Sequence, residues 1–365
     1  MTRLIAPEWV WSEGVLRRGL ALEIGGGALK RLRPLGPEER PDAAPYLVSP
    51  GFIDLQVNGG GGVMVNSEPT EGGILAVAAA HRAVGTAGIL PTLITDAPER
   101  LDQTVEAMLG LWGERGVLGL HVEGPHISPE RRGTHDPRFI RPLDARTLSA
   151  LRRLRAAGIP VLLTLAPEQA QPDQIREARE MGVVLSMGHT AATKDQALAA
   201  LEAGFSMGTH LYNAMTPMSS RDPGVVGTLI DSGAYCGLIC DGIHVSWPMA
   251  RIAVRGRPRK GRSFIVSDAM ATVNGPDHFE LYGQKIFVRD GALVNAAGSL
   301  AGAHIDMAQS FAHAVRRLGL PLGEALSMCL ETPLEAMDLP ARGLAEGTPL
   351  DEILVFDRDL KRIEV

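Results

Sequence analysis

Residues 160–189 read PVLLTLAPEQAQPDQIREAREMGVVLSMGH, and the fold prediction starts from this stretch. The apolar run Pro160–Leu165 predicts a buried strand, Gln174–Met181 predicts a helix, and Val183–Met187 predicts a second strand. Both strand-like runs are continuous rather than alternating, as is typical of parallel strands that are covered on both faces. The stretch therefore predicts a strand, a crossover helix and a parallel strand, and His189 follows directly after them.

The same pattern repeats on both sides of this unit and predicts eight strands in all. Eight parallel strands with helical crossovers are the count of an α/β (β/α)8 barrel of the TIM type. A doubly wound open sheet is the alternative, but a dinucleotide-binding sheet needs G-x-G-x-x-G opening a helix, and the glycine-rich Gly59–Gly62 lacks that pattern. We therefore favour the barrel. The remaining predicted strands are Phe52–Val57, Ile89–Thr95, Val117–Val122, Phe205–Thr209, Tyr235–Cys240 and Phe264–Ser267, and the remaining helices are Gly72–Val84, Pro98–Trp112, Ala145–Ala157 and Lys194–Ala203.

The two ends of the chain differ from this repeat. Short strand-like runs occur at Gly19–Ile24 and Ala28–Leu32, and again at Glu352–Phe356 and Lys361–Val365. Neither pair alone makes a stable sheet, so we predict that the two ends combine into one small β-sandwich domain. The predicted domains are 1–50 with 340–365 for the β-sandwich and 51–339 for the barrel, which ends in a hairpin at Phe279–Asn295 and a final helix at Ala303–Leu318.

Composition excludes several classes of protein. The 365 residues carry a net charge of -6, which argues against a dedicated nucleic-acid binder. The five cations within Arg255–Arg262 precede the eighth predicted strand, so we expect a solvated loop on the barrel face opposite the site. Three cysteines without framework spacing indicate a reducing interior. No apolar run approaches the ~18 residues of a membrane span, and the N-terminus lacks a signal-peptide pattern. We expect a cytoplasmic protein with neither membrane nor nucleic acid as a partner.

Polar residues of the metal-ligand type stand at the ends of the predicted strands. In a barrel these ends converge on one rim, where active sites are built. A single histidine in such a place is usually structural, but a polar residue after most of the last six strands indicates a site. The residues are His121, Glu123 and His126 after the third strand, His189 after the fifth, His210 after the sixth, His244 after the seventh and Asp268 after the eighth.

Glu123, His189 and His210 supply one carboxylate and two imidazoles. This is the ligand set of a hydrolytic zinc site whose fourth position is left to water, and iron, manganese or cobalt would also fit it. A hydrogen-bonded core cluster is the alternative. Asp268 is better suited to be the general base: a divalent ion lowers the pKa of water, and a neighbouring carboxylate can then take its proton and later protonate a departing amine.

Eight sequence segments together resemble one known family. The segment Thr209–Met215, THLYNAM, is the most specific of them. In these segments, which run in the family's order over nearly the whole chain, the protein resembles the N-acetylglucosamine-6-phosphate deacetylases of the amidohydrolase superfamily. The other segments are Pro50–Asp54, His121–His126, Gly133–His135, Gly188–Thr190, Asp241–His244, Ser267–Ala269 and Gly298–Gly302.

The resemblance implies a role for each matching residue. It implies that a phosphorylated amino sugar is the substrate, that Glu123, His189 and His210 hold the metal, and that Asp268 is the catalytic acid and base. Arg221 matches the arginine that takes the 6-phosphate, which in this family can come from the neighbouring subunit of a homodimer. The residues that match substrate contacts are Thr134, His135, Asn213, Ala214 and His244, and Leu300, Ala301 and Gly302 match a loop over the sugar.

One departure from the wider superfamily concerns the number of metal ions. Many amidohydrolases carry His-x-His after the first strand, where this chain has Gln56 and Asn58, and amides are poor transition-metal ligands beside imidazole. The stretch Leu165–Glu168 also lacks the lysine that bridges two metals in many members. One subset of the deacetylases shows the same replacement, so we predict one divalent ion per chain. The alternatives are an amidohydrolase that acts on a cyclic amide, a base deaminase, an enzyme for a related N-acetyl amino sugar, or a non-catalytic scaffold.

Overall fold

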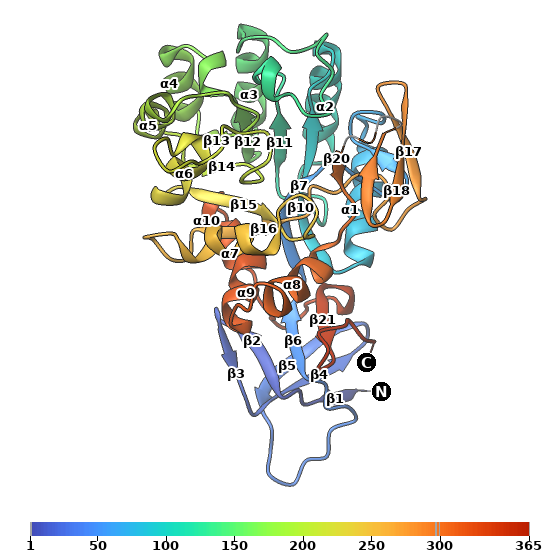
Figure 1. Cartoon of the computed structure of the whole chain (residues 1–365). Helices are drawn as coiled ribbons and strands as arrows, with labels where there is room; N and C mark the ends of the chain where they lie inside the picture. Colours follow the sequence, from blue (N-terminus) through green and yellow to red (C-terminus); the bar gives the residue numbers. More distant parts are fainter. Residues whose placement is uncertain (1, 296–297, 299, 365) are drawn as a thin grey trace.

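A barrel of eight parallel strands dominates the computed structural model, which describes residues 2–295, 298 and 300–364 (Figure 1). The eight strands pair with one another in their order along the chain. The first and last also meet, since Val57 forms a parallel bridge with Ala269 just after the last strand. The predicted barrel is therefore confirmed, and the open sheet is excluded. The strands are β7 (Phe52–Val57), β10 (Thr86–Ile94), β11 (Leu120–Glu123), β12 (Val161–Leu165), β13 (Val184–Met187), β14 (Met207–Gly208), β15 (Tyr235–Ile239) and β16 (Ser263–Val266).

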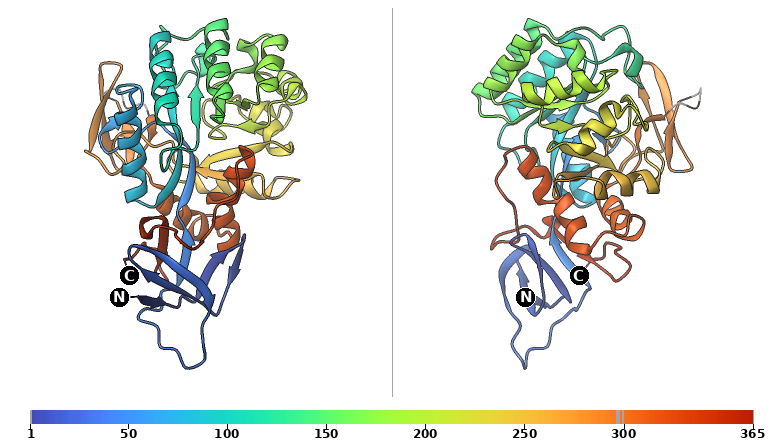
Figure 2. Two further views of the ribbon diagram at one scale, coloured as in Figure 1. Left: turned by 180° about the vertical axis from the view of Figure 1, so that it is seen from behind. Right: turned by 60° about the vertical axis from the view of Figure 1, so that its left-hand side comes forward.

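Helices cover the outside of the barrel in both views of Figure 2. Side-chain caps set several of their starts: Thr70, Asp144 and Thr193 each accept a hydrogen bond from the third backbone N–H of the following helix. Among the described residues, no helix is both long and apolar enough to cross a membrane. The helices are α1 (Glu71–Ala83), α2 (Pro98–Leu111), α3 (Ala145–Ala156), α4 (Pro172–Glu180), α5 (Lys194–Ala203), α6 (Gly224–Asp231), α7 (Trp247–Arg255), α8 (Met307–Arg316), α9 (Leu322–Cys329) and α10 (Glu331–Ala336).

Four of these helices were not located from the sequence: the crossovers α6 and α7, which the barrel requires but no stretch marked, and α9 and α10 after α8. In α6 every residue from Gly224 to Ile230 is buried, so the helix has no polar face whose periodicity would reveal it. The predicted final helix, Ala303–Leu318, contains α8, but its start was placed four residues too early and it is not the last helix. Ala303 ends a strand, α8 begins at Met307 behind the N-cap Asp306, and α9 and α10 follow it.

A four-stranded antiparallel sheet replaces the single hairpin predicted at Phe279–Asn295. It lies beside the barrel mouth, and its last strand returns to the barrel, where Ala303 bridges Ala269. Residues 296, 297 and 299 lie outside the described residues, so Ser299 of the quoted segment Gly298–Gly302 is not placed. The strands are β17 (His278–Leu281), β18 (Gln284–Arg289), β19 (Ala292–Val294) and β20 (Leu300–Ala303).

Both ends of the chain contribute to a second, smaller β domain below the barrel (Figure 1). Its two sheets have the orders β1-β4-β5 and β21-β6-β2-β3, and β21 near the C-terminus pairs antiparallel with β6. The predicted strand Lys361–Val365 is wrong: Arg362 makes only an isolated bridge to Phe356, and residue 365 is not described. The boundaries at 50 and 340 remain predictions. The strands are β1 (Arg3–Ile5), β2 (Trp9–Ser12), β3 (Val15–Arg17), β4 (Leu20–Gly25), β5 (Ala28–Pro34), β6 (Leu47–Pro50) and β21 (Ile353–Phe356), and β8 (Gly59–Gly60) with β9 (Val63–Met64) forms a small ribbon at the barrel mouth.

Three phenylalanines join the β domain to the barrel. Phe52 begins the first barrel strand, Phe311 lies on α8 and Phe356 ends β21. Their ring centroids are 5.3 to 6.1 Å apart, and all three side chains are fully buried. Aromatic pairs at these distances contribute about 0.5–1.5 kcal/mol each beyond the area that they bury. The contact therefore holds the start of the barrel and α8 against β21 near the C-terminus.

The basic segment Arg255–Arg262 lies before β16, on the barrel face away from the site, as predicted. It is not a purely solvated loop, however. Arg257 is buried and donates a hydrogen bond to the carbonyl oxygen of Ala234, and the Arg262 guanidinium stacks over the Tyr235 ring at 4.1 Å. Two of the five cations therefore support the fold.

Candidate functional site

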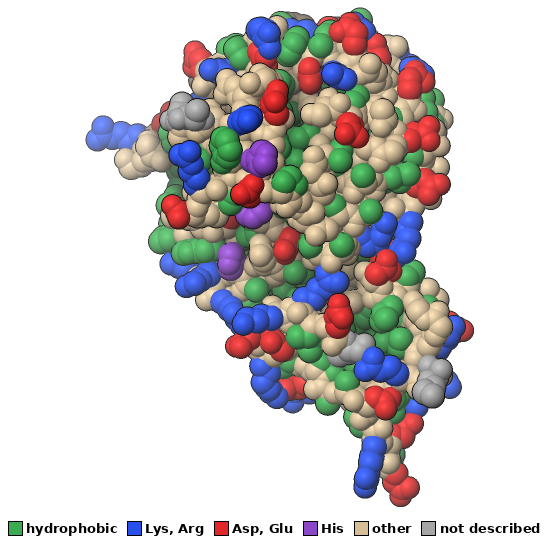
Figure 3. Space-filling model, turned by 90° about the vertical axis from the view of Figure 1, so that its right-hand side faces the viewer, with side chains coloured by type: hydrophobic (Ala, Val, Ile, Leu, Met, Phe, Trp, Pro, Cys, Tyr) green, Lys and Arg blue, Asp and Glu red, His purple; other side chains and the backbone are tan. Residues whose placement is uncertain are grey.

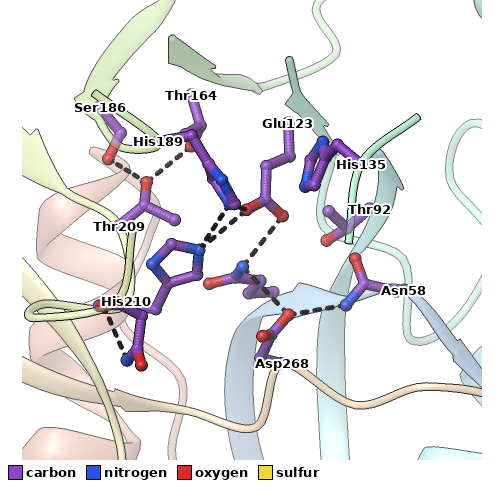
Figure 4. A network of polar contacts seen from close by, with 12 residues as sticks. Asn58, Thr92, Glu123, His135, Thr164, Ser186, His189, Thr209, His210 and Asp268 are labelled. Carbon is purple, nitrogen blue, oxygen red and sulfur yellow. Dashed lines mark hydrogen bonds and ion pairs between the residues drawn. The ribbon is translucent and has the colours of Figure 1, made fainter. Parts of the chain in front are cut away.

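Three polar side chains from neighbouring strand ends converge inside the barrel mouth (Figure 4). Glu123 is the last residue of β11, His189 follows β13 and His210 follows β14. Glu123 Oε1 lies 3.1 Å from His189 Nε2 and 3.0 Å from His210 Nε2, and the two histidine nitrogens are 3.1 Å apart. All three residues are buried. The structure thus brings together the three residues that the sequence suggested as ligands.

An unusual backbone conformation directs the side chains at these strand ends. His189, His210 and Asp268 have φ values of 47°, 31° and 52°, in the left-handed region that residues other than glycine rarely adopt. Such conformations cost on the order of 1–3 kcal/mol each and cluster at functional sites. All three residues follow barrel strands, and the turn at each strand end carries the side chain into the mouth.

The chemistry of this set fits a divalent metal ion. His189 Nδ1 lies 2.8 Å from the carbonyl oxygen of Arg131 and donates its proton there, which leaves a lone pair on Nε2 for the centre. Burial alone would raise the pKa of Glu123, but its contacts with His189 and His210 outweigh burial and hold that pKa well below the usual range. An ionised carboxylate and two imidazole nitrogens, all within 4.8 Å of one another, are ligands that such an ion takes in hydrolytic sites.

Asp268 lies beside this set and is held by two amides from the end of β7. Its Oδ1 accepts hydrogen bonds from Gln56 Nε2 at 3.1 Å and from Asn58 Nδ2 at 2.7 Å. The same Gln56 nitrogen donates to Glu123 Oε2 at 3.0 Å. Burial, together with the charge of Glu123, raises the pKa of Asp268 to about 6. A carboxyl group with such a pKa can exchange a proton near neutral pH.

A cavity of about 180 Å³ opens above these residues. It is lined by Glu123, His189, His210 and Asp268, and by most of the substrate contacts suggested by the sequence. Ile94 and Met270 also line it, and nothing in their own sequence context distinguished them from core residues. Figure 3 shows a face of the molecule on which histidine side chains lie near acidic and basic ones. The suggested substrate contacts in the lining are Thr134, His135, Asn213, Ala214, His244, Leu300 and Gly302.

Two of the suggested residues do not line this cavity. Ala301 is buried behind it in β20 and packs in a cluster that includes Met270. Its neighbour Gly302 has a φ of 66°, and a Cβ at that position would lie 2.3 Å from the Met270 side chain. Arg221 lies on the exposed stretch 217–222, outside the lining of the cavity.

Two histidines in the cavity wall are held by hydrogen-bond partners for which the sequence suggested no role. His244 Nδ1 lies 2.6 Å from Asp241 Oδ2, and His135 Nδ1 lies 2.7 Å from Thr95 Oγ1. Burial lowers the pKa of His135 well below its usual value, so its ring is neutral. Asp241 could have been found, because it stands three residues before His244 in a quoted segment. Thr95 could not, because it comes from a different strand.

The other histidines named from the sequence have structural partners. His121 Nε2 lies 2.7 Å from Thr164 Oγ1, and His126 Nε2 lies 2.9 Å from Thr147 Oγ1. Burial lowers the pKa of each to about 4, which keeps both rings neutral. His304, in the loop between β20 and α8, has its Nδ1 2.9 Å from Thr272 Oγ1 and does not line the cavity.

Comparison with known proteins gives consistent matches. Residues 47–361 match the model of the amidohydrolase family. The chain is 36% identical to an N-acetylgalactosamine-6-phosphate deacetylase from Shewanella sp. (strain ANA-3), over 95% of this chain and 90% of that one. It is 34% identical to an N-acetylglucosamine-6-phosphate deacetylase from Haemophilus influenzae, over 84% and 81%. A Mycobacterium smegmatis N-acetyl-D-glucosamine-6-phosphate deacetylase, solved in complex with N-acetyl-D-glucosamine-6-phosphate, superposes with a TM-score of 0.87 at 32% identity, covering 99% of this chain and 96% of that one.

Proposed function

The chain belongs to the amidohydrolase family, and we propose that it hydrolyses the N-acetyl group of N-acetylglucosamine 6-phosphate to glucosamine 6-phosphate and acetate, in amino-sugar metabolism. The observation that carries the proposal is the convergence of Glu123, His189 and His210 beside Asp268 in one cavity. The relatives support the class of substrate, since those that are 36% and 34% identical are named as deacetylases of amino-sugar 6-phosphates.

One divalent ion, zinc in our proposal, would be held by Glu123, His189 and His210, and iron, manganese or cobalt would suit the same ligands. When bound, such an ion supplies a Lewis acid that polarises the amide carbonyl and lowers the pKa of water. Gln56 and Asn58 would leave the second position of a two-metal site without imidazole ligands. The expected content is therefore one ion per chain.

Asp268 carries the proton in the proposed reaction. Its carboxylate takes a proton from the attacking water and then delivers that proton to the nitrogen of the departing amine. Thr134, His135, Asn213 and Ala214, which line the cavity, would hold the sugar. His244, oriented by Asp241, would contact the substrate, and residues 300–302 would lie over it.

The 6-phosphate would be bound by Arg221, which carries a positive charge on an exposed segment outside its own chain's cavity. This position suits a homodimer in which each subunit supplies its arginine to the neighbouring site. We therefore propose a cytoplasmic homodimer as the working form. A guanidinium can bind phosphate through two parallel hydrogen bonds, which explains the choice of arginine over lysine.

N-acetylgalactosamine 6-phosphate is the second candidate substrate, because the relative that is 36% identical is named for it. The two sugars differ only in the configuration of the C4 hydroxyl. Cyclic amides are less favoured, because their hydrolases usually carry the His-x-His that positions 56 and 58 lack.

Acetate release from a panel tests the proposal directly. The panel comprises both N-acetylhexosamine 6-phosphates, both unphosphorylated sugars and a cyclic amide such as hydantoin. We expect acetate from a phosphorylated sugar with kcat/KM at least tenfold above that of its unphosphorylated form, and no turnover of the cyclic amide. Turnover of hydantoin without acetate release from any sugar would contradict the proposal.

A further inference from the structure

We propose that Gln56 and Asn58 are positioning residues that determine which oxygen of Glu123 and which oxygen of Asp268 faces the reacting centre. The sequence marks these two amides only as poor metal ligands. In the structure Gln56 donates hydrogen bonds to both Glu123 and Asp268, and Asn58 donates one to Asp268. The inference rests on the proposed function, and it concerns how one ligand and one base are kept in their working orientations.

The Asp268 carboxylate is held through a single oxygen. Oδ1 accepts from Asn58 Nδ2 at 2.7 Å and from Gln56 Nε2 at 3.1 Å. Among the described residues, Oδ2 has no hydrogen-bond partner, although Asp268 lines the cavity. An oxygen that already receives two donors is a weaker acceptor for a further proton, so the amides leave Oδ2 as the atom that meets water. Asn58 points at Asp268 in Figure 4, which shows this contact.

Gln56 also determines which oxygen of Glu123 faces the proposed metal ligands His189 and His210. A carboxamide nitrogen carries two hydrogens, and here they serve two different carboxylates, Glu123 Oε2 at 3.0 Å and Asp268 Oδ1 at 3.1 Å. The other Glu123 oxygen, Oε1, faces His189 and His210. Gln56 therefore ties the orientation of a proposed metal ligand to that of the proposed base.

A neutral donor suits this position electrostatically. Glu123 and Asp268 are both buried, and the negative charge of Glu123 opposes ionisation of Asp268. The amide hydrogens carry partial positive charge that offsets this repulsion, and a carboxamide does not lose them at any working pH.

An unpaired oxygen in Asn58 indicates that folding stability alone does not explain this residue. Its Oδ1 is buried and has no hydrogen-bond partner among the described residues. An unsatisfied buried oxygen is unfavourable for stability. The side chain keeps this unpaired oxygen while its nitrogen makes the short contact to Asp268, which is what a positioning role requires.

The test uses isosteric variants that lack donors, Asn58→Leu and Gln56→Met. For each we would measure kcat, KM and the zinc dissociation constant by chelator competition. Asn58 touches only Asp268, so Asn58→Leu should lower kcat about 10- to 100-fold and change KM and zinc affinity less than threefold. Gln56 touches both carboxylates, so Gln56→Met should lower kcat and also weaken zinc binding about 10- to 100-fold.

Thr104 provides a control away from the site. It is a buried polar residue of α2, its Oγ1 donates to the Arg100 carbonyl oxygen, and it does not line the cavity. Thr104→Val should lower thermal stability without altering kcat or zinc affinity. A purely structural role for Asn58 and Gln56 would make their variants behave in the same way, and that result would overturn the proposal.

Repeating the Asn58→Leu substitution in the Asp268→Asn variant separates positioning of Asp268 from any other effect of Asn58. If Asn58 acts through Asp268, then Asn58→Leu should cost less than threefold in kcat when Asp268 is already asparagine. An equal loss in both backgrounds would refute the positioning role. Zinc affinity is measured without substrate, so the result for Gln56 stands apart from the proposed function. If the wild type released no acetate while Gln56→Met still weakened zinc binding, only the proposed function would fail.

Discussion

At the scale of single residues, Asp268 bears most of the proposed chemistry. Asp268→Asn keeps the shape of the side chain but cannot accept the proton of water. We expect kcat to fall about 10²–10⁴-fold, the usual contribution of general acid and base catalysis, with metal content and KM nearly unchanged. Steady-state kinetics together with elemental analysis of the same preparation measures both. Activity within a few-fold of wild type would exclude Asp268 as the base and leave His244 as the next candidate.

Arg221 is the residue whose role depends on a second chain. Because a charge-assisted contact contributes about 1.5–3 kcal/mol, Arg221→Ala should remove most of the preference for the phosphorylated sugar while barely changing activity on the unphosphorylated one. Part of this binding energy positions the amide, so kcat should fall as well as KM rise.

Mixed dimers locate the arginine of each site. An inactive Asp268→Asn chain combined with an Arg221→Ala chain should regain activity if the arginine crosses between subunits, because one site of the pair then has both groups. If mixing restores nothing, Arg221 serves its own chain. If the Arg221→Ala protein by itself loses activity equally on the phosphorylated and the unphosphorylated sugar, Arg221 supports the fold or the dimer instead. The phosphate would then be bound by other cations such as Arg131 and Arg132.

At the scale of elements, the end of β7 determines how many ions the site can hold. Gln56 and Asn58 lie where two imidazoles would complete a second site, and amides bind transition metals weakly. Purified protein should contain about one tightly bound divalent ion per chain. The double variant Gln56→His/Asn58→His should take up a second ion while losing the amide contacts to Asp268. Elemental analysis that gives two ions per fully active wild-type chain would contradict this prediction.

At the scale of the whole molecule, buried neutral histidines make stability depend on pH. Burial lowers the pKa of His81, His121 and His126 to about 4, below the ordinary value of about 6.5. Between these values the unfolded chain binds protons that the folded chain does not. The contribution of these histidines to stability is therefore fully present above pH 6.5 and falls as the pH drops toward 4, by up to about 3 kcal/mol for each histidine at pH 4. The raised pKa values of the buried Asp54 and Asp268 act in the opposite direction.

Urea unfolding of the metal-free protein between pH 7 and pH 4.5 measures this dependence. His81 Nε2 donates a hydrogen bond to the carbonyl oxygen of Gly59 at 2.9 Å, and its Nδ1 has no partner among the described residues. His81→Gln should therefore reduce the slope of stability against pH by nearly one proton. His278 is exposed and lies outside the core, and His278→Gln should leave the slope unchanged. An unchanged slope in His81→Gln would show that His81 does not contribute to the loss at acid pH.

Much of the barrel could be predicted because its signal is local. Continuous apolar runs such as Pro160–Leu165 mark strands that are buried on both faces, and helices such as Lys194–Ala203 carry their own capping residues. The helix α6 and the sheet β17–β20 could not be predicted in this way. The helix is buried all round, and the sheet depends on pairing between strands rather than on the pattern within one.

For the site, the chain alone determined which residues stand at strand ends, and parallel strands bring such ends to one rim whatever their distance along the chain. Glu123, His189 and His210 could be named together for this reason. Only the tertiary structure decided how they face one another, that Gln56 and Asn58 donate to Glu123 and Asp268, and that Arg221 lies outside its own cavity. These are relations between side chains 67 to 212 residues apart, and their directions are set by packing and by backbone turns that no local sequence pattern encodes.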